Sequence, residues 1–424
     1  MATTPTNLSG LFKEVYADNL INLIPAEDKL IRAVPFVPAD KELGNKYHQP
    51  VIVNQEQGFT YAGIDAGAFA LNSAISMNTQ DAQVQGYQIL LRSSLAYDAA
   101  ARASNSRKAF VKETELMVEN MMESITKRTE ISCWYGQSGI ATLASSVNGS
   151  ATTTTVTITT AEFAAGIWAG MENGTIDVYQ SDGTTKINSN ALLTVTQVNV
   201  GARTLLLTGN STDITNLDSY ISSNPDAAIV FFRGANSNEM AGMYKIMTNT
   251  GTLFNISATT YNLWKSNTFS SSSAALTFGK LVQAVGTAVN RGLNEDVSVY
   301  VNPVTWGNLL TDQAALRRYD GSYSNRQVET GARSLQFHSQ NGMIEVVSHN
   351  IVKEGQAFVF PTKRVRRIGA WDIGFKCPGR GDEEIFTQLA DNAGYELRAY
   401  TDQSIFIETP AKCTIITGIV NSAS

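Results

Sequence analysis

The segment between Lys46 and Leu91 constrains the fold most, because its ends resemble strands while its middle cannot build a core. Residues 46–53 and 84–91 are rich in the Tyr, Val, Ile and Leu that are typical of strands. Residues 58–78 are mostly small or polar, and their few large side chains include Phe59, Tyr61, Phe69 and Leu71. An isolated hairpin of this length is only marginally stable in water. We therefore predict a long hairpin that packs on its own subunit or on a neighbour.

Apolar spacing predicts helices that can cover a sheet. Residues 96–131 are expected to be helical, most clearly after Asn105. One narrow apolar stripe runs along this segment and consists of Phe110, Thr114, Met117, Met121 and Ile125. A narrow stripe indicates a helix that rests on a sheet along one side only. A second helix is predicted over residues 278–289, and a third after Asn302, which would cap a helix that begins at Pro303.

The composition changes abruptly after Tyr135. Residues 136–150 have the Gly and Ser content of a loop. Short strands rich in Thr, Val, Ile and Leu follow, separated by turns, and they are expected at residues 152–160, 174–179, 192–200 and 204–207. This pattern predicts a compact all-β module over residues 140–232, inserted into a chain of mixed helices and strands. Further strands are expected at residues 297–301, 343–348, 357–360, 395–401, 405–408 and 413–420.

Charge and apolar content exclude several classes of protein. The net charge of -6 argues against broad phosphate binding, which needs clustered Lys and Arg. Residues 1–10 lack the basic start and apolar core of a secretory signal, and no apolar run approaches the length of a membrane span. Three scattered cysteines, Cys133, Cys377 and Cys413, favour reduced thiols over a disulfide framework. We expect a protein that is made in a cytoplasm and contacts no membrane.

The sequence gives little sign of catalytic chemistry. His48, His338 and His349 stand alone, without a second ligand at metal-binding spacing. No phosphate-binding loop, nucleophile elbow or dinucleotide fingerprint occurs. The acidic cluster Asp382-Glu383-Glu384 is interpreted as a solvated loop, and the basic run 363–367, which contains Arg364 and Arg366, as a solvated face or as ion pairs across a subunit boundary. We therefore predict no catalytic residues, no metal and no cofactor.

The order of these elements resembles that of the major capsid protein of tailed double-stranded DNA bacteriophages. Residues 11–16 resemble an N-terminal arm, and Lys46-Tyr47-His48-Gln49-Pro50-Val51 resembles the first strand of the extended loop. Residues 105–131 are similar to the spine helix of the peripheral domain. The stretch Val299-Tyr300-Val301-Asn302-Pro303-Val304-Thr305-Trp306 resembles the strand and helix of the axial domain, and residues 344–347 and 357–360 resemble its later strands.

The resemblance implies an α+β fold of the tailed-phage major capsid type, divided as follows. Residues 1–34 would form the N-terminal arm, 35–95 the extended-loop hairpin, 96–139 the spine helix of the peripheral domain and 140–232 an inserted β-barrel-like domain. Residues 233–375 would form the axial domain with parts of the peripheral domain, and 376–424 the strands that complete both.

The resemblance also implies self-assembly into hexamers and pentamers of an icosahedral head, which is assembled in the host cytoplasm and becomes part of the virion. Its partners would be further copies of the chain, a separate scaffolding protein, a portal protein and a decoration or cement protein. Packaged DNA would be enclosed without sequence-specific binding. The candidate subunit contacts are Lys46, Tyr47, Phe59, Tyr61, Phe69, Arg364, Arg366, Asp382, Glu383 and Glu384.

Three other interpretations compete with a phage head. An encapsulin-like compartment would share the fold but package an enzyme instead of DNA. A hydrolytic enzyme with a β-rich accessory module needs no sequence motif for its acid pair. A secreted β-rich adhesin would explain the Thr, Asn and Ser content, but it would need a signal and fewer long helices. Microscopy of the purified chain separates the shell-forming proteins from the other two.

Overall fold

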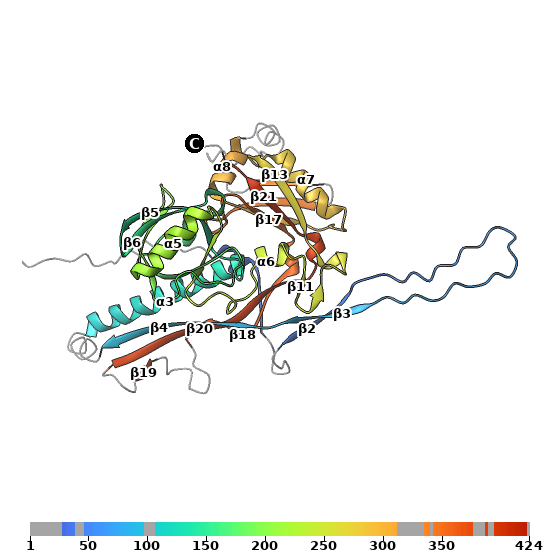
Figure 1. Cartoon of the computed structure of the whole chain (residues 1–424). Coiled ribbons are helices and arrows are strands. Elements are labelled where there is room, and N and C mark those ends of the chain that lie inside the picture. The colour runs from blue at the N-terminus through green and yellow to red at the C-terminus, as the bar shows by residue number, and fades with distance from the viewer. Residues whose placement is uncertain are drawn as a thin grey trace, which may run out of the picture.

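A computed structural model describes residues 28–38, 46–96, 107–311, 335–339, 342–375, 386–388 and 394–421 (Figure 1). Among these, the side chains of residues 95, 96, 107–116, 335–339 and 386 are not described. Residues 11–16, which resemble an N-terminal arm, and the acidic cluster Asp382-Glu383-Glu384 lie outside the described residues.

A long sheet forms the lower edge of the molecule in Figure 1, and one helix covers it. Its strands lie in the order β1 (Phe36–Pro38), β18 (Val365–Gly374), β20 (Gly394–Ile407) and β19 (Phe386–Gln388), and β4 (Tyr87–Ala96) also pairs with β20. The covering helix is α3 (Arg107–Tyr135).

The predicted apolar stripe holds α3 on this sheet. Met121 and Ile125 are buried against Leu397 and Ala399 of β20, and Met117 packs at the edge of this cluster. The stripe is therefore confirmed at these positions, whereas the side chains of its first two members are not described. The helix also runs on to Tyr135, beyond its predicted end, and its last turns are buried all round instead of facing solvent.

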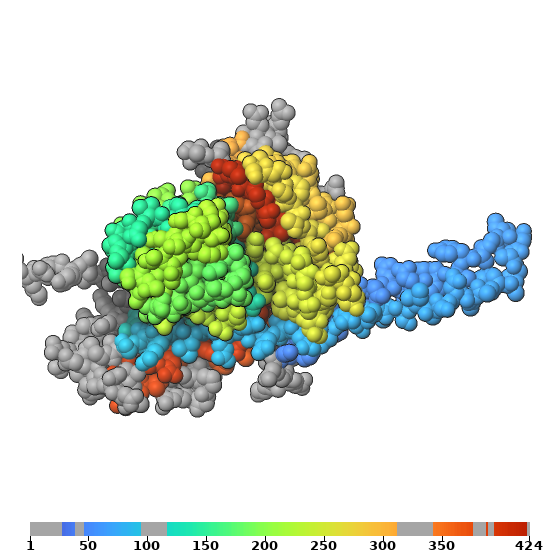
Figure 2. Space-filling view, in the orientation of Figure 1, coloured from blue at the N-terminus to red at the C-terminus, as the bar shows by residue number. Residues whose placement is uncertain are grey.

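The extended hairpin is present, but its return strand differs from the prediction. β2 (Tyr47–Ile52) pairs antiparallel with β3 (Thr79–Val84), and the ribbon projects far from the body (Figures 1 and 2). The segment predicted as the return strand, residues 84–91, mostly belongs to β4 and pairs with β20 instead. The reason is the apolar pattern: Ile89 and Leu91 face the cluster under α3, so this strand is needed in the long sheet.

A second sheet, the axial sheet, stands above the first. Its order is β13 (Asn267–Ala274), β21 (Thr414–Ile419), β17 (Ala357–Phe360), β14 (Val297–Val301), β16 (Gly342–Ser348) and β15 (Leu335–Ser339). The helices α7 (Phe278–Val289) and α8 (Pro303–Thr311) add apolar side chains to its core. The predicted cap is confirmed, because the amide of Val304 donates to Asn302 Oδ1 at 3.0 Å.

The predicted β-rich module is a closed barrel. Its strands, in the order β10 (Ala228–Phe232), β5 (Ala141–Ser150), β6 (Thr153–Ile158), β9 (Thr204–Thr208), β8 (Leu193–Asn199) and β7 (Thr175–Tyr179), close on themselves. Two predictions are wrong here. The module is not all-β, because α5 (Ser211–Ser223) packs Ile214, Leu217 and Ile221 into its core. Residues 141–150 are a strand instead of a loop, since alternate side chains at its start are buried.

Short elements connect these parts. They are α1 (Lys29–Ala33), α4 (Ala165–Trp168), α6 (Met243–Met247), β11 (Thr252–Leu253) and β12 (Ile256–Ser257), with 3₁₀ turns at Thr160–Glu162, Asn262–Trp264, Thr362–Arg364 and Pro410–Lys412. Cys133 and Cys413 are buried free thiols, as predicted, and Cys377 lies outside the described residues. Over the described part of the chain, no helix combines the length and apolar character that a membrane crossing requires.

Candidate functional site: the hairpin and its base

The base of the hairpin is anchored to the body by apolar contacts. Ala82 and Val84 of β3 are buried in a cluster with Trp264, Ile368 and Phe406. Tyr47 and Val51 of β2 pack against the same cluster, because alternate residues of a strand face the same side. The amide of Gln83 donates to the carbonyl of Phe254 at 3.0 Å. The base therefore belongs to the folded subunit.

Polar pairs on the ribbon also fix the base. His48 Nδ1 lies 2.6 Å from Asp81 Oδ2, and the bond to His48 lowers the pKa of the Asp81 carboxyl. Lys46 Nζ donates to Gln83 Oε1 at 3.1 Å, and the hydroxyl of Tyr47 donates to Gln49 Oε1 at 2.9 Å. These pairs lie on exposed or half-exposed surface, where water screens the charges and each pair adds little to stability.

The tip of the hairpin has strand-like hydrogen bonds but no core. The amide of Gln57 donates to the carbonyl of Ile75, and Asn72 bonds both Thr60 Oγ1 and the carbonyl of Phe59. Apolar side chains stay in water along its whole length. The exposed fraction is 63% for Phe59, 89% for Tyr61 and 50% for Phe69, and Ile64 and Leu71 are also exposed. Several large apolar side chains are therefore exposed on one projecting ribbon, a feature that is typical of interaction sites.

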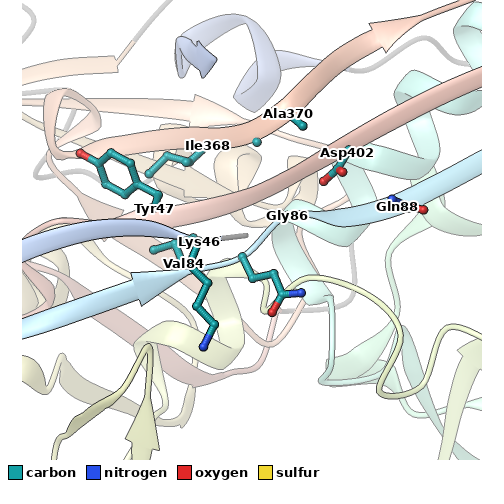
Figure 3. Close-up of a pocket in the computed structure, with 10 residues that line it drawn as sticks. Lys46, Tyr47, Val84, Gly86, Gln88, Ile368, Ala370 and Asp402 are labelled. Carbon is teal, nitrogen blue, oxygen red and sulfur yellow. The ribbon is translucent and has the colours of Figure 1, made fainter. Parts of the chain in front are cut away.

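A cavity of about 360 Å³ lies where the hairpin meets the long sheet (Figure 3). Lys46, Tyr47 and Val84 line it from the hairpin, and Ile368, Ala370 and Asp402 line it from β18 and β20. Gly86 and Gly369 sit so close to Asp402 that a Cβ at either position would collide with it. Gly369 lets β18 lie directly against the backbone of β20, and Gly86 lets the chain pass from the hairpin into β4 beside the Asp402 side chain. Among the described residues that line the cavity, Lys46, Tyr47 and Asp402 are the ionisable ones.

Arg364 and Arg366 form ion pairs inside the subunit. Arg364 binds both oxygens of Glu295, at 2.8 Å for its Nη2 and Oε1, and lies 3.7 Å from Glu408. Arg366 Nε lies 2.6 Å from Glu408, and Lys412 Nζ lies 2.8 Å from Glu295. The hydrogen bonds from Arg364 and Lys412 lower the pKa of Glu295 to about 2. This network joins the long sheet to the start of β14, and a role of the two arginines between subunits stays a prediction.

One buried polar cluster could not be identified from the sequence. The Glu130 carboxylate of α3, fully buried, accepts hydrogen bonds from the amides of Leu30 and Ile31 in α1, both at 2.9 Å. It also accepts from Trp134 Nε1 at 3.2 Å and His349 Nε2 at 2.8 Å. The amide of Ile351 donates to His349 Nδ1, so Nε2 carries the imidazole proton. This Glu130 cluster ties α1, α3 and the loop after β16 together.

Neither a protein-family model nor a curated protein sequence matches this chain. Solved structures do. The capsid asymmetric unit of Cyanophage A-1(L) has a TM-score of 0.57 at 10% identity, with 98% of this chain and 99% of that chain covered. The capsid of the native GTA particle has a TM-score of 0.53 at 7% identity, with 99% and 100% covered. The chain therefore has the fold of these capsid proteins over nearly all of its length, and it contains a small closed barrel.

Proposed function

We propose that this chain is the major capsid protein of a tailed double-stranded DNA phage. Copies of it would assemble into hexamers and pentamers and close an icosahedral head around the genome. The observation that carries the proposal is the likeness over the full length to two capsid proteins, each covered to 99% or more. The exposed apolar hairpin tip supports it independently, because such a tip is explained by a partner that covers it.

The hairpin would supply much of the contact between subunits. Its base is fixed by the Trp264 cluster, so the tip is presented in a defined direction. Covering one large apolar side chain is worth about 1.5–3 kcal/mol. Phe59, Tyr61 and Phe69 would therefore contribute several kcal/mol when a neighbour covers them. Lys46 and Tyr47 lie at the base and are proposed as lesser contacts.

The remaining candidate contacts are proposed with different roles. Arg364 and Arg366 already bind Glu295 and Glu408, so in a shell they would hold the two sheets in register and present their outer N–H groups to a neighbour. Asp382, Glu383 and Glu384 are proposed as acidic contacts because they form an acidic cluster in the sequence. They lie outside the described residues.

The proposal extends to the partners of a phage head. A separate scaffolding protein, a portal protein and a decoration or cement protein would join the shell, whose assembly would take place in the host cytoplasm. The acidic balance of 38 Asp and Glu against 32 Lys and Arg suits a wall that encloses DNA without gripping it. The role is structural and includes no catalytic step.

Electron microscopy of the purified chain tests the proposal. We expect closed particles or rings of subunits from the wild-type chain. Dispersed monomers under every condition that promotes assembly would contradict it. The content of the particles separates a phage head from a cargo compartment, because a head encloses DNA and a compartment encloses an enzyme.

A shortened hairpin tests the mechanism. Residues 58–78 are replaced by an Asn-Gly turn, which joins the ribbon beyond its anchored base. We expect unchanged thermal melting of the free subunit and a loss of closed particles, because the removed residues contribute to no core. Glu56→Gln, on the same ribbon and exposed, is the matched control and should assemble normally. Insolubility of the shortened chain would place the hairpin in the subunit core, and normal assembly would show that the tip is dispensable.

A further inference from the structure

A second cavity, of about 530 Å³, opens between α3, β4 and the end of the barrel. We name it the Arg128 pocket. Ile89, Leu91 and Ile125 provide apolar walls, and Phe232 lies at the end of the last barrel strand. Figure 1 shows the three elements that form it, with α3 above β4 and the barrel above α3. Gln88 lines both this pocket and the cavity at the hairpin base, but the two share no other described lining residue.

Arg128 faces this pocket without an anionic partner in hydrogen-bonding distance. Its guanidinium carbon lies 3.3 Å from the centre of the Phe232 ring, so one face of the group is covered by the aromatic side chain. Among the described residues, the guanidinium donates no hydrogen bond and forms no ion pair. Burial lowers the pKa of Arg128 to about 10, which indicates a cation that has lost part of its hydration.

The neighbouring charges favour a singly charged anion. Arg233 lies in the same lining, is exposed, and has no side-chain partner among the residues that the structure describes. Lys127, by contrast, is engaged, because its Nζ donates to the carbonyl of Ala169 at 2.6 Å. Glu239 also lines the pocket, and in its ionised form it offsets part of the Arg128 charge, which favours a single over a double negative charge on the ligand. The apolar walls can hold the methylene groups of a side chain that carries such a carboxylate.

We propose that the Arg128 pocket receives the carboxylate of an acidic side chain from a neighbouring copy of this chain, with Arg128 as its main partner and Arg233 at the rim. The assignment to a neighbouring copy rests on the proposed function, in which every subunit is surrounded by others. Each copy has 38 acidic and 32 basic residues, so some of its carboxylates have no basic partner within the same copy. Such a carboxylate can pair with Arg128 of a neighbour.

The first test uses the free full-length subunit and a defined probe. N-acetyl-glutamate N-methylamide is titrated in, and the Arg128 Nε–H resonance is followed by NMR, because the Phe232 ring shifts it away from the other arginines. N-acetyl-glutamine N-methylamide and inorganic phosphate are the comparison ligands. We expect saturable shifts with the Glu probe and weaker binding, by about tenfold or more, with the neutral isostere, as the loss of a charged hydrogen bond predicts. Equal binding of the two probes, or none, would overturn the proposal.

The second test uses assembled particles. Arg128→Met keeps the stem over Phe232 and removes the charge. Lys245→Met is the control, because Lys245 is an exposed cation of α6 with no side-chain partner among the described residues. Melting of the free subunits is recorded first, so that a folding defect is recognised. We expect Arg128→Met particles to dissociate at a lower denaturant concentration than wild-type and control particles. If the Arg128→Met particles resist denaturant as well as wild-type particles, Arg128 only covers Phe232 and the proposal is wrong. If the wild-type chain forms no particles, the result counts against the proposed function, and the NMR titration alone then tests the pocket.

Discussion

Replacing Glu130 by Ala should destabilise the subunit more than any change of an exposed acid. Four hydrogen bonds converge on its carboxylate, two from backbone amides of α1 and two from Trp134 and His349. The Glu130 side chain and the His349 ring are fully buried, so no solvent replaces the lost acceptor. A buried donor left without a partner costs about 1–3 kcal/mol.

At the low end of that range, the four donors together cost about 4 kcal/mol, which is a large share of the about 5–15 kcal/mol that stabilises a folded domain. The affected donors lie in α1, in α3 and in the loop after β16, so the loss weakens the contact of α1 with the body first. We therefore expect early release of residues 28–38, followed by unfolding at lower temperature.

The assay combines thermal melting with hydrogen exchange of the α1 amides. In the wild-type chain, the Leu30 and Ile31 amides should exchange slowly, and in Glu130→Ala they should exchange fast. Glu119→Ala, an exposed position on the same helix, is the matched control and should melt like the wild-type chain. A Glu130→Ala subunit that melts with the control and keeps both amides protected would refute the reasoning.

Other predictions concern the spine helix, a buried acid and the barrel. Met121→Lys places an ammonium in the cluster under α3 and should prevent assembly, whereas Glu119→Lys should be mild; equal shell yields would show that the helix face is misassigned. Burial raises the pKa of Glu239 to about 7, so the folded state binds a proton at this carboxyl more tightly than the unfolded state does. This adds at most about 3 kcal/mol to the free energy of unfolding at low pH, and the addition is lost as the pH rises from about 4.5 to above 7. Denaturant titrations at pH 5 and pH 8 should therefore show a smaller loss of stability for Glu239→Gln than for the wild-type chain, and parallel losses would contradict it. Residues 140–232 expressed alone should melt cooperatively, and a flat trace would count against an independent module.

The sequence predicted the elements whose signal is local. The cap at Asn302, the helix over residues 278–289 and four barrel strands were found because capping and apolar spacing depend on neighbours along the chain. The apolar stripe of α3 was visible for the same reason. The prediction ended the helix at Ile131, whereas α3 runs on to Tyr135, and only tertiary partners explain why the polar Glu130 and Ser132 of its last turns are buried.

Features that depend on pairing between distant segments could not be predicted from the sequence. Residues 84–91 read as a strand, but nothing in them tells whether the partner is β2 or β20. The helix α5 was not predicted, because its Ser, Thr, Asn and Asp residues are weak helix formers. Its three buried apolar residues stabilise it only by packing on the barrel. For the candidate site, Phe59, Tyr61 and Phe69 stood out in the sequence because they are large apolar residues in a segment of small and polar ones. The ion pairs of Arg364 and Arg366 with Glu295 and Glu408 could not be predicted, because these residues are distant in the sequence.

The two segments that connect the barrel to the rest of the subunit lie next to each other. The segment before the barrel and the segment after it meet at two glycines, and the amide of Gly242 donates to the carbonyl of Gly136 at 3.0 Å. A Cβ on either glycine would collide with the backbone of the other segment, so the two strands of chain touch directly. Glu239 adds to the junction by accepting from Ser132 Oγ and the Gln137 amide. Because the two ends lie side by side, the path from α3 to α6 is as short as it would be without a barrel. We infer that the barrel is an insertion at this junction, and that the body relies on it for part of its packing, because Phe163 and Trp168 of the inserted segment belong to the core that also contains Trp134.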